Sequence, residues 1–95
     1  MVIGFGTVTL RMANCHSLKE KRKIIKSIIA RTQNSFNVSI AEISLNDAHH
    51  QAQIGFAVVG NDRRFINSML DKLIEFIGNL QLADLIDSSL EIMNI

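Results

Sequence analysis

The sequence predicts a small α+β domain of the ferredoxin-like class, with the element order β-α-β-β-α-β. Three observations predict it: two segments carry apolar residues at helical spacing, four segments read as strands, and 95 residues suffice for only one compact domain. Two β-α-β units that share a central hairpin combine into a four-stranded antiparallel sheet of order 4-1-3-2, with both helices on one face. We therefore expect residues 1–95 to form a single ferredoxin-like domain.

The first strand and the first helix are predicted from the first third of the chain. Residues 2–12 are rich in strand-forming side chains that alternate in the second half of the segment. Gly4 and Gly6 share one face of this strand, which would let a helix approach the sheet closely. Ser17 and Glu20 form a capping box, in which the Ser17 hydroxyl accepts the Glu20 amide and the Glu20 carboxylate accepts the Ser17 amide. The core-facing side chains of the helix, which extends to about residue 33, are Leu18, Ile24, Ile25, Ile28, Ile29 and Thr32.

The remaining elements are a β-hairpin, a second helix and a last strand. Extended runs at residues 36–45 and 51–60, joined by a polar segment, predict the hairpin. A second helix follows, with Asn61 and Asp62 as N-cap oxygens and Gly78-Asn79 as its C-cap pair. Residues 85–95 alternate as the last strand. The apolar period of the second helix comprises Phe65, Ile66, Met69, Leu70, Leu73, Ile74 and Ile77.

Composition favours a soluble cytoplasmic protein. Cys15 is the single cysteine and cannot form an internal disulfide, and Met1–Phe5 lacks the basic start and apolar stretch of a secretory signal. The longest apolar runs, such as Phe56–Val59, are far shorter than the ~20 residues of a membrane helix. Hydrophobic residues make up 47% of the chain and there is no proline, so we expect all of it to fold, with no membrane partner.

Three blocks of sequence resemble a known family. They are Ser17–Arg22, Phe36–Glu42 and Ala57–Asp62, and at their spacing the chain is similar to the YlxP-like family of bacterial proteins over essentially its whole length. That family is of unknown function. The resemblance implies a ferredoxin-like fold and genes that often lie beside translation and ribosome-maturation genes, and it carries over no catalytic residue. Members usually have a small or nonpolar residue in place of Cys15, so we expect no shared role for this thiol.

The strongest functional feature is a row of cations on the first helix. Residues 1–31 hold seven Lys/Arg against one acid, whereas residues 32–95 hold three against eight. Four cations at relative spacing 0, 3, 4 and 7 lie along one side of the helix, where they suit a phosphate backbone. They are Lys19, Arg22, Lys23 and Lys26, with Lys21 at the edge of the row and Arg11 leading into it.

This row predicts a non-enzymatic module that binds RNA or the ribosome, and the family resemblance implies that it acts in translation or ribosome maturation. The alternative is an ordinary solvated helix face, since any surface helix carries charges. Phe5 and Phe56 stand alone on the strands, without the aromatic pair that stacks bases in RNA-recognition sheets, so contact is expected to the backbone rather than to bases on the sheet.

Metal and catalytic sites are not predicted, and neither a cofactor nor a small-molecule ligand is inferred. Cys15 and His16 fall at the same end of the sheet as a hairpin turn with further zinc-type ligands, but neither group has metal-knuckle spacing, and whether they converge is left open. The fold also serves acylphosphatases, which hold phosphate with an arginine and an asparagine, yet this chain lacks their glycine-rich loop. The turn residues are Asp47, His49 and His50, and the acylphosphatase comparison involves Arg11 with Asn37 or Asn61.

The other functional hypothesis is a dimeric structural or protein-interaction domain. With both helices on one face of the sheet, Ile3 and Phe5 lie on the opposite, uncovered face. An uncovered apolar sheet face is a partner site. We consider a homodimer through this face or through the edge of the second strand.

Overall fold

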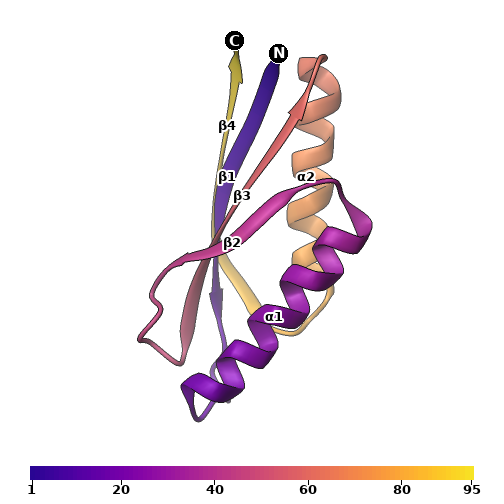
Figure 1. Ribbon diagram of the computed structural model, residues 1–95. Helices are drawn as coiled ribbons and strands as arrows, with labels where there is room; N and C mark the ends of the chain where they lie inside the picture. The colour runs from indigo at the N-terminus through magenta and orange to yellow at the C-terminus, as the bar shows by residue number, and fades with distance from the viewer.

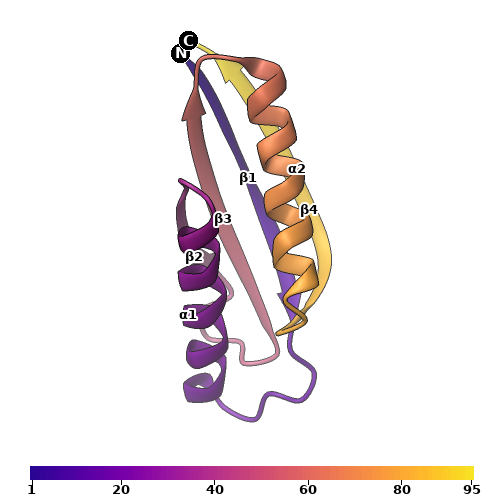
Figure 2. The same ribbon diagram turned by 90° about the vertical axis from the view of Figure 1, so that its right-hand side faces the viewer.

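The computed structural model describes residues 1–95, which form four antiparallel strands in one open sheet and two helices. Both helices lie on the same side of the sheet, and the two chain ends lie side by side (Figures 1 and 2). The strand order is β2-β3-β1-β4, which is the predicted 4-1-3-2 order read from the other edge. In chain order the elements are β1 Val2–Arg11, α1 Leu18–Ser35, β2 Ser39–Ser44, β3 Gln51–Gly60, α2 Arg63–Asn79 and β4 Asp84–Asn94.

One hydrophobic core lies between the sheet and the two helices. Alternate residues of β1 and β3 face it, and the register places Val8 opposite Ile54 and Gly4 opposite Val58. Helix α1 packs against β2, while α2 packs against β1 and β4. The apolar helix residues buried in this layer are Ile25 and Ile28 of α1 and Ile66, Leu70, Leu73 and Ile77 of α2. Neither helix is long and apolar enough to cross a membrane.

Glycine on β1 lets α2 approach the sheet closely, as predicted. A Cβ atom at Gly4 would lie 2.5 Å from Cγ2 of Ile66 and 2.7 Å from Cδ1 of Leu70. Both side chains are fully buried, so neither can move aside without disturbing the core. At Gly6 a Cβ atom would instead collide with the backbone carbonyl of Ser89 on β4.

Three details of the helices differ from the predictions. The capping box is shifted by one residue: Ser17 Oγ accepts the Glu20 amide at 3.1 Å, but Glu20 Oε2 accepts the amide of His16, at 2.8 Å, rather than that of Ser17. Asp62 makes no side-chain cap hydrogen bond to α2. Helix α2 ends at Asn79 as predicted, but the residue with positive φ that turns the chain is Gln81, at 54°, and not Gly78.

A buried lysine joins α1 to the hairpin that follows it. Lys21 is only 1% exposed, and its ammonium group donates to the carbonyl oxygens of Leu45, at 2.6 Å, and Ala48, at 2.7 Å. The same group lies 2.9 Å from Glu42 Oε2 in the only salt bridge of the molecule, and this oxygen has no other partner. Lys21 thus supplies the donor for the Ala48 carbonyl and the Glu42 carboxylate, and a second donor for the Leu45 carbonyl, which also accepts the Ala48 amide at 3.1 Å.

This position corrects the prediction that Lys21 lies at the edge of the basic row. Lys21 precedes the buried residues Ile25, Ile28 and Thr32 at spacings of four, three and four, so it occupies the core-facing side of α1. The prediction for Phe65 was wrong in the opposite direction, because this residue of the apolar period of α2 is 63% exposed.

The close approach at Gly4 predicts a loss of stability on Gly4→Ala. The added methyl group must displace Ile66 or Leu70, and such overpacking costs about 1–3 kcal/mol of unfolding free energy. The matched control is Gly55→Ala on the opposite face, where the nearest atoms belong to the exposed side chain of Ile43, at 3.0 Å. Urea denaturation should show a large decrease for the first variant and little change for the second; equal stability of the two would contradict this packing.

The Lys21 clamp predicts that Lys21→Met destabilises the protein by roughly 2–4 kcal/mol, somewhat below the loss for a fully buried pair because Glu42 is 20% exposed. The variant keeps the apolar stem and removes only the ammonium group. Changing Glu42 to Gln as well should recover part of the loss, since no unpaired charge then remains. Lys23→Met, on the exposed side of α1, is the control and should change the stability by less than about 0.5 kcal/mol. Urea unfolding midpoints that agree for the two single variants would refute the clamp.

Candidate nucleic-acid interface

The candidate interface is the basic face of α1, which we define as Lys19, Arg22, Lys23 and Lys26. All four side chains are exposed, on the side of the helix that points away from the buried residues. None of them pairs with a carboxylate, because the one salt bridge of the molecule belongs to Lys21. The basic face therefore holds four cations within two turns, free to meet an anionic partner.

The one carboxylate on α1 does not neutralise this face. Glu20 is held at the start of the helix, where its Oε2 accepts the backbone amide of His16. A carboxylate at a helix N-terminus is stabilised by the helix dipole, so Glu20 has a local role in capping. Arg31, further along the same helix, is also exposed and unpaired, but it lies about 120° around the helix from Lys19 and so is not part of this face.

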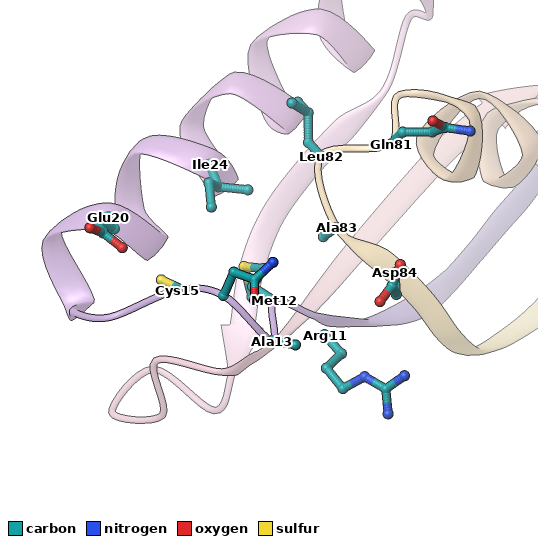
Figure 3. Close-up of a pocket in the computed structure, with 11 residues that line it drawn as sticks. Arg11, Met12, Ala13, Cys15, Glu20, Ile24, Gln81, Leu82, Ala83 and Asp84 are labelled. Carbon is teal, nitrogen blue, oxygen red and sulfur yellow. The ribbon is translucent and has the colours of Figure 1, made fainter.

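Two residues predicted to support the basic face do not belong to it. Lys21 is excluded because its ammonium group is buried and already holds three oxygen atoms. Arg11 is exposed, but in β1 it alternates with the core residues Leu10 and Met12, so it lies on the sheet side opposite the helices. Figure 3 shows its guanidinium group pointing away from α1 and from Glu20.

Charge is distributed unevenly across the sheet. Helix α1 packs on the β2 side with its basic face outward, and α2 separates it from β4 (Figure 2). The edge strand β4 carries no cation, and its exposed acids are Asp84, Asp87 and Glu91. An anionic ligand would therefore be attracted to the α1 side of the molecule and repelled from the β4 edge.

The candidate metal ligands do not assemble into a site. No three His, Cys, Asp or Glu side chains lie together in a way that could hold a metal ion. Cys15 is buried, with its Sγ atom 3.3 Å from the carbonyl oxygen of Ser17. The rings of His49 and His50 stack edge to face at 4.4 Å. The two loops do meet at the backbone, through the Met12 amide, which donates to the His50 carbonyl at 2.7 Å.

The acylphosphatase comparison fails on geometry. Arg11 ends β1 opposite Gln51, whereas Asn61 follows Gly60, which pairs with Val2 at the other end of the same strand. Nine residues of extended strand separate the two ends by roughly 30 Å. Asn37 precedes β2, which first pairs with β3 at Ala57, so it too lies well away from Arg11.

A pocket of about 260 Å³ lies at the end of the sheet where β1 leads into α1 and α2 leads into β4 (Figure 3). Its lining includes the carboxylates Glu20 and Asp84 and the thiol residue Cys15. Two carboxylates against one cation, Arg11, give the lining a net negative charge, which is unfavourable for phosphate. Its place in the fold, beside the first turn of α1, sets it apart from the basic face.

The face of the sheet without helices carries apolar side chains, as predicted. Ile3 and Phe5 lie there, on the opposite side of β1 from Gly4. A bulge in β2 between Glu42 and Ser44 leaves the Ile43 side chain over Gly55 on this face, beside a shallow hollow of about 330 Å³. The exposed apolar residues that the strands place on this face include Ile43, Val59 and Met93.

Comparison with known proteins shows which family the chain belongs to. The family described as "Protein of unknown function (DUF503)" matches residues 3–90. The chain is 38% identical over 78 residues to "Uncharacterized protein YlxP" of Bacillus subtilis (strain 168), covering 82% of this chain and 85% of that protein. The solved "Structure of the REP associates tyrosine transposase bound to a REP hairpin" is similar at a TM-score of 0.45 and 11% identity, covering 98% of this chain and 56% of that one, a likeness too low to establish a shared fold or function. The resemblance predicted from the sequence is confirmed, and the chain belongs to the YlxP-like DUF503 family.

Proposed function

We propose that this protein is a non-enzymatic module that binds RNA or the ribosome through the phosphate backbone. The observation that carries the proposal is the basic face, in which Lys19, Arg22, Lys23 and Lys26 are exposed and unpaired on one side of α1. Several weak cationic contacts in a row match the repeated charge of a nucleic-acid backbone better than they match a single small anion.

The setting of the basic face supports the same function. The acidic β4 edge on the far side of α2 disfavours binding there, so a polyanion has one preferred side of the molecule. The resemblance of the chain to its family implies a role near translation or ribosome maturation. A single buried cysteine, which has no partner for a disulfide, fits action in the reducing cytoplasm.

We also assign the fold to the ferredoxin-like class. Its support is the element order β1-α1-β2-β3-α2-β4 together with the strand order β2-β3-β1-β4. In this arrangement α1 connects β1 to β2 across the intervening β3, which leaves the solvent side of α1 uncovered. The fold thereby explains how one helix can be both a core element and a binding surface.

A second candidate function is assembly of a dimer through the open sheet face. Val59 and Met93 are 66% and 48% exposed there, and they adjoin Ile3 on both sides in the strand register. Exposed apolar side chains that form one patch favour a protein partner over solvent. A second copy of the chain would cover this face without obstructing the basic face, which lies on the helix side.

Reversing the basic face tests the proposed function directly. The variant K19E/R22E/K23E/K26E should lose co-sedimentation with ribosomes and bulk RNA at low salt, because attraction to phosphate becomes repulsion. Its thermal unfolding should stay close to that of the parent protein, since all four side chains are exposed and unpaired. Arg63→Gln, at a cation whose guanidinium faces the Ile92 carbonyl of β4, is the control and should bind within about twofold of the parent. Undiminished binding by the reversed variant would rule the basic face out.

The dimer hypothesis predicts a molecular mass of twice 10.6 kDa in sedimentation velocity at high protein concentration. Val59→Lys combined with Met93→Lys should restore the monomer, because two buried ammonium groups would then face an apolar surface. A parent protein that stays monomeric at every accessible concentration would remove this hypothesis.

A further inference from the structure

Phe65 is an aromatic side chain that is exposed, although its spacing on α2 predicts burial. It lies in the first turn of α2 and is the only aromatic residue among the exposed large hydrophobic side chains. It faces the α1 side of α2, but α1 ends at Ser35 and the chain then turns into β2. The first turns of α2 therefore have no helix beside them, and Phe65 borders an open groove.

This groove has a volume of about 320 Å³, and one of the residues that line it is held in place by packing. The ring of Phe36, which lines it, packs edge to face against Phe76 of α2 at a centroid distance of 5.5 Å. Both rings are partly buried against the core. The residues that line the groove are Ser35, Phe36, Asn37, Phe65, Ser68, Met69 and Lys72.

The chemistry of the lining favours a flat aromatic ligand that carries negative charge. Phe65 offers a ring face, and Lys72, seven residues further along α2, lies on the same side about 10 Å away. Ser68 and Asn37 add a hydroxyl and an amide. No carboxylate lines the groove, in contrast to the pocket beside Glu20 and Asp84. An aromatic platform next to a cation is the usual means of holding unpaired bases.

The groove lies at the C-terminal end of α1, around the helix from the basic face. From Lys26 to Ser35 the helix rises about 14 Å, and the exposed Arg31 stands between them. Arg31 is about 140° around the helix from Lys26, so a strand whose phosphates contact the basic face would reach the groove by passing around α1 at Arg31. The cations Lys72 and Arg31, with an exposed aromatic ring and no carboxylate in the lining, favour a nucleic acid over an apolar protein segment as the occupant.

We propose that this groove binds an unpaired base of single-stranded RNA, stacked on Phe65, with Lys72 against a neighbouring phosphate. The inference rests on the proposed function and deepens it, since the basic face alone would bind single strands and duplexes alike. Base stacking adds affinity for the single strand only, because a base within a duplex cannot enter the groove.

The test compares two probes and four proteins by fluorescence anisotropy at low salt. The probes are a labelled 12-nucleotide oligouridylate and a labelled RNA duplex of the same length. The proteins are the parent, Phe65→Ala, Phe65→Trp and, as a control at an exposed apolar residue on β4, Ile86→Ala. Phe65→Ala should weaken binding of the oligouridylate about 5- to 100-fold and leave binding of the duplex unchanged. Phe65→Trp should retain single-strand affinity, and Ile86→Ala should bind both probes like the parent.

The outcomes separate this inference from the proposed function. If the parent binds both probes and Phe65→Ala binds both equally well, or weakens both equally, the stacking assignment is overturned while the basic face survives. If the parent binds neither probe at low salt, the proposed function itself fails. Should the groove instead take a protein segment, Phe65→Ala would leave both RNA affinities unchanged, which also overturns the assignment.

Discussion

The buried ammonium group of Lys21 is the interaction on which the arrangement of the molecule depends. It holds two carbonyls of the β2–β3 turn and the carboxylate of Glu42, so it fixes the rotation of α1 about its own axis and its position over the hairpin. With Lys21 turned inward, the cations at 19, 22, 23 and 26 must point outward. Lys21 thus stabilises the fold, and the four neighbouring cations remain exposed and able to bind an anion. The basic face follows from the packing of its own helix.

Two features of the sheet set the limits of what the molecule can bind and where. Gly4 allows α2 to sit close on β1, so at this point of the strand the core is filled by Ile66 and Leu70 of the helix. Because α1 is needed over β2, it stops short of the first turns of α2 and leaves the groove at Phe65. The acids of β4 lie at the opposite edge. Cationic, aromatic and acidic surfaces are therefore separated by the fold itself.

Much of this architecture can be predicted from the local sequence pattern, and each wrong prediction has a specific physical cause. The strands, both helices and the strand order follow from periodicity and connection rules. Lys21 was misplaced because its residue type indicated a surface position, although its spacing to Ile25, Ile28 and Thr32 indicated the core. The acceptors that justify burial come from another element, and no local pattern shows them. The prediction for Phe65 was wrong for the converse reason: its spacing indicated burial, but the side chain is exposed. The length of α1 decides whether the side of α2 that carries Phe65 is covered.

The most direct test of the central claim is the salt dependence of RNA binding by the parent protein. Four phosphate contacts from the basic face predict that the logarithm of the association constant falls linearly with the logarithm of salt concentration, with a slope of about −3 on a single strand. A slope of this size would mean that backbone contacts supply most of the affinity. A slope near zero, or no binding at the lowest salt, would contradict the account and leave the open sheet face as the surface to study.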